Sequence, residues 1–184
     1  MKFQPSSLAN GEFASAWFDD EKQTWGDERL QRIGSIVNDW RPPRLKLVRA
    51  KCGVADVLFN PNALAVSSRI REQLAGFSEI EFLPIAIAGC ETYFVVHVTA
   101  TVEVSPRFST RRAPPPSGNV VELYGFPVGY QPSTAFFRVR QPTDSAGGRA
   151  GYCLPELYAS QEGARAVESA CTPFLHARAL RRPN

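Results

Sequence analysis

The chain has 184 residues, of which 43% are hydrophobic and 21% charged, and its net charge is +3, so it can bury a core of its own. It contains no apolar run near the ~20 residues that a membrane-spanning helix requires, and its start, "MKFQPSSLANGEF", lacks the apolar core of a secretory signal. These features argue against a membrane protein and against a disordered chain, and we expect a cytoplasmic protein.

The first predicted elements are a helix and several short strands. Residues 26–40 favour a helix because apolar residues recur at spacings of three and four and form one stripe, made of Leu30, Ile33, Val37 and Trp40. "RPP" at 41–43 ends this helix, since the residue before a proline is disfavoured in helical backbone. "LKLVRA" (45–50) alternates like a strand, and "DVLFNPNALAV" (56–66) predicts two strands joined by a turn.

The next stretch, residues 64–85, predicts a strand, a helix and a second strand. Ser67 or Ser68 is a natural N-cap, and Ile70, Leu74 and Phe77 then form the buried stripe of a helix that ends near Gly76. "EIEFLPIAI" (79–87) and "TYFVVHVTATVEV" (92–104) are the clearest strand patterns, and "AGCE" between them suits a hairpin. We therefore expect an antiparallel sheet with the helix packed on one face.

The second half alternates loops and strands before a last helix. Residues 107–119 hold three prolines and a glycine and predict a loop, and residues 142–151 predict another. "VVELYGF" (120–126) and "TAFFRVRQ" (134–141) predict strands between them. A helix capped by Ser160 and the strand-like "TPFLHARAL" (172–180) follow; Gly163 inside this helix should weaken it by ~1 kcal/mol relative to alanine.

The two serine-capped helices lie in segments with the same plan. Aligning Ser67 with Ser160 also places Leu74 with Val167 and, after a one-residue gap, Phe82 with Phe174. The alignment leaves open whether the similarity is a true repeat. The predicted fold class is α+β, with a mainly antiparallel sheet and a few packed helices. We predict one domain over 1–184, either undivided or made of two strand–helix–strand lobes, 1–105 and 106–184.

Catalytic and metal-binding patterns are absent from the sequence. The histidines are His97, in the middle of a strand pattern, and His176, which has no acid or nucleophile at a fixed spacing. Cys52, Cys90, Cys153 and Cys171 stand far apart, without the paired spacing of a zinc site, and suit buried thiols. We expect no catalytic residue, no metal and no cofactor. A small enzyme whose site is assembled from distant residues stays open as an alternative.

Charge is distributed unevenly along the chain. Residues 12–28 hold six acids and one lysine, whereas residues from 105 onward hold ten arginines and five acids. Weak nucleic-acid binding through the short arginine clusters is a second alternative, but these clusters lack interleaved aromatic residues and match no known module. They consist of Arg111, Arg112, Arg178, Arg181 and Arg182.

The order of the segments resembles a family of bacterial immunity proteins from polymorphic toxin systems, formerly a domain of unknown function and named after a myxobacterial immunity protein. The resemblance covers about residues 40 to 180. It rests on "ADVLF" with Asp56, "VSSRIREQL" with Ser67 and Ser68, "IEFLPI", "YFVVHVTATVEV", "AFFRVRQ" and "LYASQEGARAVESA" with Ser160. The chain departs from the family after the Tyr strand. The family has an Asp and then a Ser at this point, whereas "VEVSPRFS" offers at best Glu103 and Ser109.

The resemblance implies a protein that acts by binding. Proteins of this family bind and neutralise a cognate toxin domain, with nuclease toxins as the expected class, and so protect the producing cell. The serine motifs then serve as helix caps of a frame. The partner expected is the toxin, with no specific nucleic acid and no membrane, and the oligomeric state stays open.

The acidic and aromatic segment 12–28 is the predicted toxin-binding surface. Nuclease sites hold phosphates and are basic, so opposing negative charge on the inhibitor raises the association rate, and tryptophan is enriched among interface hot spots. The alternative is that Trp17 and Phe18 fill the core while the acids face solvent. The predicted residues are Trp17, Phe18, Asp19, Asp20, Glu21, Trp25, Asp27 and Glu28.

Overall fold

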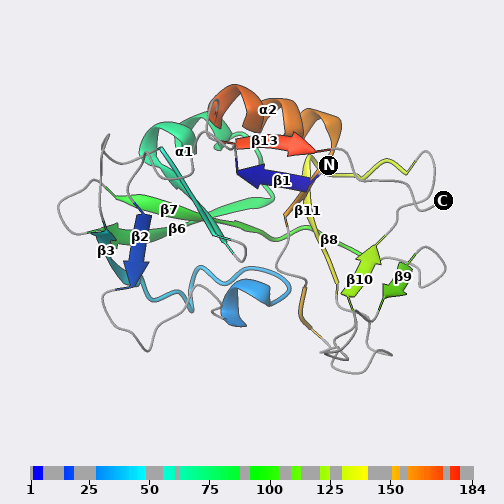
Figure 1. Cartoon of the computed structure of the whole chain (residues 1–184), viewed down its shortest axis with the longest axis horizontal. Coiled ribbons are helices and arrows are strands. Elements are labelled where there is room, and N and C mark those ends of the chain that lie inside the picture. Colours follow the sequence, from blue (N-terminus) through cyan, green and yellow to red (C-terminus); the bar gives the residue numbers. More distant parts are fainter. Residues whose placement is uncertain are drawn as a thin grey trace.

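The computed structural model of the chain describes residues 2–5, 15–18, 28–48, 56–60, 63–87, 92–103, 109–112, 121–124, 130–140, 151–153, 157–171 and 175–178. Its strands form sheets of six, five and two strands (Figure 1). The helices of the described residues are α1 (Ser68–Leu74), α2 (Gln161–Cys171) and the 3-10 helix Glu28–Gln31. The predicted α+β class is confirmed.

The six-stranded sheet has the order β2-β3-β6-β7-β5-β4. Its centre is the hairpin of β6 and β7, which was predicted from sequence, and only β3 and β6 pair in parallel. The strands are β2 (Ser15–Phe18), β3 (Arg44–Val48), β4 (Val57–Asn60), β5 (Ala63–Ser67), β6 (Ile80–Ile87) and β7 (Tyr93–Val98).

The five-stranded sheet has the order β13-β1-β12-β11-β8, and β8 pairs in parallel with β11 while the other pairs are antiparallel. A separate ribbon joins β9 to β10. The strands are β1 (Lys2–Pro5), β8 (Thr101–Val102), β9 (Ser109–Arg112), β10 (Val121–Tyr124), β11 (Phe136–Val139), β12 (Tyr158–Ala159) and β13 (Leu175–Arg178).

Both larger sheets contain the same strand–helix unit. In the first, β5 leads into α1 and on to β6, while β7 lies between β5 and β6 and pairs antiparallel with both. In the second, β12 leads into α2 and on to β13, while β1 lies between β12 and β13 in the same antiparallel way. The neighbours β4 and β11 also correspond, since each pairs antiparallel with the strand before the helix. The similarity of the two segments therefore extends to their topology.

The fourth strand of the second unit comes from the start of the chain. β7 follows β6 through a short connection, whereas β1 precedes every other element. A boundary at residue 105 does not follow the sheets, because β1 pairs with β13. The strand predicted at 92–104 is likewise shared: β7 ends at Val98 in one sheet, and β8 begins at Thr101 in the other.

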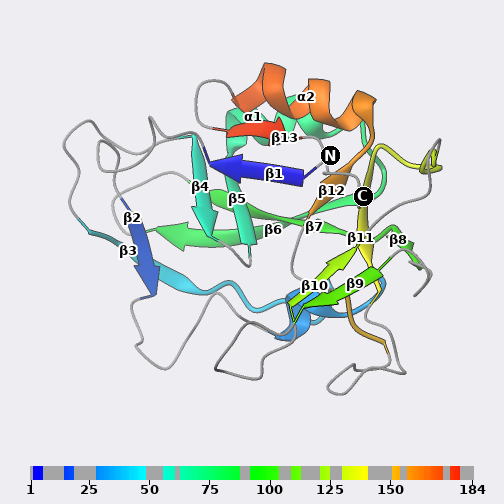
Figure 2. The same cartoon turned by 45° about the vertical axis from the view of Figure 1, so that its right-hand side comes forward.

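The main core lies between the helices and the sheets. α1 and α2 lie side by side (Figures 1 and 2). α1 packs on β5 and β7 of the six-stranded sheet, whereas α2 packs on β12 and β13 of the five-stranded sheet. Ile70 and Leu74 of α1 share one buried cluster with Val167 of α2 and with Phe136 of β11. The opposite face of the six-stranded sheet packs on Ile36 and Trp40, from the segment that follows the 3-10 helix.

The sequence predicted the cap of each helix correctly. Ser67 rather than Ser68 is the N-cap of α1, since its Oγ accepts from the N–H of Ile70 at 3.5 Å. Ser160 Oγ accepts from the N–H of Gly163 at 3.2 Å at the start of α2.

The helix predicted over 26–40 is wrong beyond its first turn. Only Glu28–Gln31 is helical, Gly34 has a positive φ of 85°, and Val37 of the expected apolar stripe is 51% exposed. The carbonyl groups of Leu30 and Arg32, which a helix would use internally, accept hydrogen bonds from Arg138 instead.

The loop predicted over 107–119 is wrong over four residues. Ser109–Arg112 forms β9 and pairs with β10. The three prolines that favoured a loop begin only at Pro114, so nothing in "STRR" itself prevents pairing. Residues 113–119 lie outside the described residues, as do 142–150 of the second predicted loop.

Candidate functional site

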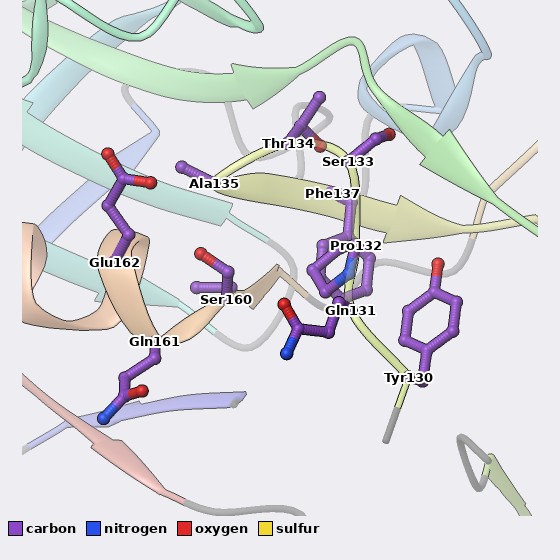
Figure 3. Close-up of a pocket in the computed structure, with 11 residues that line it drawn as sticks. Tyr130, Gln131, Pro132, Ser133, Thr134, Ala135, Phe137, Ser160, Gln161 and Glu162 are labelled. Carbon is purple, nitrogen blue, oxygen red and sulfur yellow. The ribbon is translucent and has the colours of Figure 1, made fainter. Parts of the chain in front are cut away.

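The described surface contains an open hollow of about 480 Å³ between the start of α2 and the segment that leads into β11. We call it the Ser160 hollow. Gln131 and Ser160 face each other across its middle, while Tyr130 stands at one end and Gln161 at the other (Figure 3). Its lining consists of Tyr130, Gln131, Pro132, Ser133, Thr134, Ala135, Phe137, Ala159, Ser160, Gln161 and Glu162.

Backbone pairing brings the two sides of the hollow together. β11 and β12 pair with Phe136 opposite Ala159, and Ser160 N–H donates to the carbonyl of Ala135 at 2.8 Å. The chain before β11 therefore passes directly beside the first turn of α2, although the two segments are far apart in sequence.

Gly163 sets how closely they approach. A Cβ at this position would overlap the carbonyl oxygen of Ala135 and would lie 3.2 Å from the Cβ of Ala159. A side chain here would push α2 away from β11, so the glycine serves close packing. From the sequence alone, only the low helix propensity of Gly163 is apparent, whereas the structure also gives this glycine a packing role against Ala135.

Two hydrogen bonds and one ring contact anchor the segment that leads into β11. The N–H of Phe136 donates to Glu79 Oε1 at 3.0 Å, and Thr134 Oγ1 donates to the carbonyl of Phe136 at 2.8 Å. The ring of Phe136 packs edge-on against Phe77, with centroids 4.9 Å apart. These contacts anchor the chain directly after the residues that form one wall of the hollow.

The hollow presents hydrogen-bonding groups and the exposed ring of Tyr130, while the second aromatic residue of its lining, Phe137, is buried. Gln131, Ser133, Gln161 and Glu162 are exposed, and Tyr130 is 39% exposed. Glu162 carries the one formal charge among the lining residues, in the first turn of α2. Such a surface can bind a partner through amides, hydroxyls and a carboxylate.

A second polar cluster lies buried between the sheets and the segment after the 3-10 helix. Glu81 of β6 and His97 of β7 face each other in register, and Glu81 Oε2 lies 3.0 Å from His97 Nδ1. The same carboxylate oxygen accepts from the N–H of Ile36 at 3.2 Å. Arg138 of β11 donates to the carbonyls of Leu30 at 2.5 Å and Arg32 at 2.6 Å.

Burial determines the protonation of this cluster. His97 is 2% exposed, and burial, together with the charge of Arg138, lowers its pKa to about 4 despite the nearby Glu81. The imidazole is therefore neutral at pH 7 and donates its Nδ1–H to Glu81. Burial alone would raise the pKa of Glu81, but hydrogen bonds from Ser35, Ile36 and His97 together lower it. Burial also lowers the pKa of Arg138 and raises that of the Cys153 thiol.

The cluster joins elements rather than facing a substrate. His97, Arg138 and Cys153 are all buried, and the hydrogen bonds of Arg138 fasten β11 to the 3-10 helix and to the residue that follows it. His97 lies in the middle of a strand, as the sequence predicted. We assign it a structural role, since a general base must reach its substrate.

A third polar group joins Asp56 of "ADVLF" to Ser67 of "VSSRIREQL", which are two of the segments whose order was noted in the sequence. Ser67 Oγ donates to Asp56 Oδ1 at 2.6 Å, and Ser67 N–H donates to the Asp56 carbonyl at 2.8 Å. Arg69 Nη2 lies 2.6 Å from Asp56 Oδ2. The hydrogen bond and charge of Arg69, with the Ser67 hydroxyl, hold the pKa of Asp56 below its usual value against the opposing effect of burial. Asp56 therefore fixes the start of α1.

The predicted toxin-binding residues fall mostly outside the described part of the chain. Trp17 and Phe18 belong to β2, which is an edge strand of the six-stranded sheet, and Glu28 begins the 3-10 helix. Asp19, Asp20, Glu21, Trp25 and Asp27 lie outside the described residues. The structure does not bring Trp17 and Phe18 together with the Ser160 hollow.

Within the described residues, no group of three or more His, Cys, Asp or Glu side chains could hold a metal ion. The helices of this part of the chain are too short or too polar to cross a membrane. The Cys153 side chain is buried, and Cys52 and Cys90 lie outside the described residues.

No protein-family model matches this chain, and the search of curated proteins finds no match either.

Sequence reasoning missed the Ser160 hollow and the partners of Arg138. Gly163 in the middle of a helix was the available signal for the first, since such a glycine can mark a close backbone approach. Arg138 inside the otherwise apolar "AFFRV" was the signal for the second, because a buried charge requires partners.

Proposed function

We propose that this protein is an immunity protein that acts in the cytoplasm, where it binds and neutralises a cognate toxin domain of a polymorphic toxin system. The nuclease class of toxin is part of the proposal. The protein acts by occupying a surface that the toxin needs, and it performs no chemistry of its own.

The observation that supports this proposal most directly is the hydrogen bond from the Ser67 hydroxyl to the Asp56 carboxylate. Asp56 and Ser67 are the first two residues in the segment order by which the chain resembles the immunity-protein family. They lie eleven positions apart in the sequence, yet the Ser67 hydroxyl reaches the Asp56 carboxylate at 2.6 Å. The order of segments thus corresponds to a physical unit, in which the carboxylate and the serine together begin α1.

The remaining segments of the resemblance also form the frame. β6, β7, β11 and the second capped helix build the two related units and their common core. A frame of this kind presents loops and helix ends at its surface, and binding residues are typically found on such segments. The sequence proposes 12–28 as the contact surface, and β2 within it is an edge strand.

The test is protection of cells from the toxin. We expect a toxin to be encoded beside this gene. The C-terminal domain of that toxin is expressed in a susceptible bacterium with and without this protein, and growth and nucleic-acid integrity are followed. We expect growth only in the presence of this protein, and a stable one-to-one complex when the purified proteins are mixed. Survival without a complex, or turnover of the toxin or its substrate by this protein alone, would contradict the proposal.

A further inference from the structure

We propose that the Ser160 hollow is where the toxin docks, and that the toxin inserts a loop whose lysine or arginine side chain meets Glu162. This inference rests on the proposed function and names the surface that carries it out. It competes with segment 12–28 as the site of contact.

The dimensions of the hollow suit the tip of a loop. Its volume of about 480 Å³ falls within the roughly 300–1,000 Å³ of sites that enclose small ligands. That space admits a few side chains but not a whole secondary-structure element. The walls come from two segments, so a loop inserted between them would contact both 130–135 and the first turn of α2.

The lining has the composition of a protein-binding surface. Tyr130 places a large aromatic ring at one end of the hollow, and tyrosine contributes much contact area at small cost in conformational entropy. Gln131, Ser133 and Gln161 are exposed along the hollow and can adapt their hydrogen bonds to a partner. Aromatic rings flanked by such side chains are typical of paratopes and interface hot spots.

The charge of Glu162 indicates which kind of side chain the partner places in the hollow. Glu162 is the one lining residue with a formal charge, so an anionic group in the hollow would be repelled and a cation attracted. Glu162 also lies in the first turn of α2, where the helix dipole favours negative charge. A domain that acts on nucleic acid exposes lysine and arginine for its phosphates, and one of these is the complementary group.

The contacts of the described residues order the walls of the hollow before a partner binds. Hydrogen bonds from Ser160 to Ala135 and from Phe136 to Glu79 fix the wall before β11, and Gly163 sets its distance from α2. A binding site that is already ordered loses little entropy when the partner arrives. Most of the conformational entropy lost on binding would therefore come from ordering the loop of the toxin.

The experiment measures binding of the neighbouring toxin's C-terminal domain to variants of the full chain by surface plasmon resonance. Glu162→Lys reverses the charge in the hollow, and Ser133→Arg adds bulk and a cation at its rim. Glu72→Lys makes the same charge change on α1, where Glu72 is exposed and outside the lining. Glu162→Gln is the conservative variant if the reversal lowers thermal stability.

We expect Glu162→Lys and Ser133→Arg to weaken binding about tenfold or more, mainly through faster dissociation, and Glu162→Gln to weaken it severalfold. Glu72→Lys should bind like the wild type. Equal affinities for all four variants would overturn the inference, as would a loss confined to Asp19→Lys with Asp20→Lys, which would place the contact in segment 12–28. If the wild type itself does not bind the toxin domain, the proposed function fails, and this is a separate result.

Discussion

Gly163 is the residue at which α2 touches the backbone leading into β11. In an exposed helix, alanine in place of glycine would stabilise the helix by ~1 kcal/mol. Here the added methyl group would overlap the Ala135 carbonyl, which cannot rotate away as a side chain would, because it already accepts a hydrogen bond from Ser160. The same residue type therefore has opposite effects at an open and at a closed position.

Gly163→Ala should lower the free energy of unfolding by ~1–3 kcal/mol, the usual cost of overpacking. Gly76→Ala is the matched control, since nothing lies within 4 Å of the position that its methyl group would take, and it should leave stability unchanged or raise it slightly. Urea unfolding followed by circular dichroism measures both. If Gly163→Ala proved as stable as Gly76→Ala, the close approach of α2 to β11 would be wrong.

At the scale of elements, the second strand–helix unit is completed by a strand from the other end of the chain. β1 occupies between β12 and β13 the place that β7 occupies between β5 and β6. A connection of a few residues joins β7 to its neighbour β6, whereas β1 is far in the sequence from both strands with which it pairs. The register of β1 against β13 is thus the feature to test.

A disulfide can report that register. Gln4 pairs with His176, and directly opposed residues of antiparallel strands have Cα atoms about 4.5–5.5 Å apart, within the reach of a disulfide. Gln4→Cys with His176→Cys should therefore form a cross-link under mild oxidation, detected by mass spectrometry of the digested protein. The control pair, Gln4→Cys with Ala177→Cys, is one residue out of register and places the thiols on opposite faces. A control pair that cross-links as readily would refute the pairing.

Sequence patterns predicted the elements whose signals are local. The strands β6 and β7 alternate clearly, and the N-caps Ser67 and Ser160 are recognisable from the residues that follow them. The position of β1 could not be predicted in this way, because it depends on partners more than 150 residues away. The helix expected over 26–40 failed for a related reason: Arg138, about 100 residues later, takes the carbonyls of Leu30 and Arg32. The Ser160 hollow likewise exists only where two distant segments meet.

At the scale of the whole molecule, the buried polar cluster fastens together parts that the two sheets alone would leave separate. Glu81 and His97 belong to the six-stranded sheet, and Arg138 belongs to the five-stranded sheet. Their partners are Leu30 of the 3-10 helix and Arg32 and Ile36 of the segment after it. The shared core beneath α1 and α2 joins the same sheets on the other side. Any change in the charge of this cluster should therefore alter the stability of the whole fold.

Lowering the pH should change the charge of this cluster by protonating His97. The imidazole of an unfolded chain binds its proton near pH 6.5, whereas in the fold the pKa is lowered to about 4. Between these values the unfolded state binds more protons, so the contribution of His97 to stability is complete above pH 6.5 and declines as the pH falls toward 4. We expect a loss of roughly 3 kcal/mol over that range, since each unit of pKa difference corresponds to ~1.4 kcal/mol.

Urea unfolding at pH 7.5, 6.0 and 5.0 tests this prediction, with His97→Asn as the control variant. Asparagine keeps an N–H that can donate to Glu81 but does not titrate, so the variant should lose less stability than the wild type between pH 7.5 and 5.0. The pKa of Glu81 is lowered below its usual 4.5, so this carboxylate adds its own loss only in more acidic solution. His176 is present in both proteins and makes the same contribution to each. The comparison therefore concerns the slopes, whatever the absolute stability of the variant, and parallel slopes would show that His97 is not held neutral by the fold.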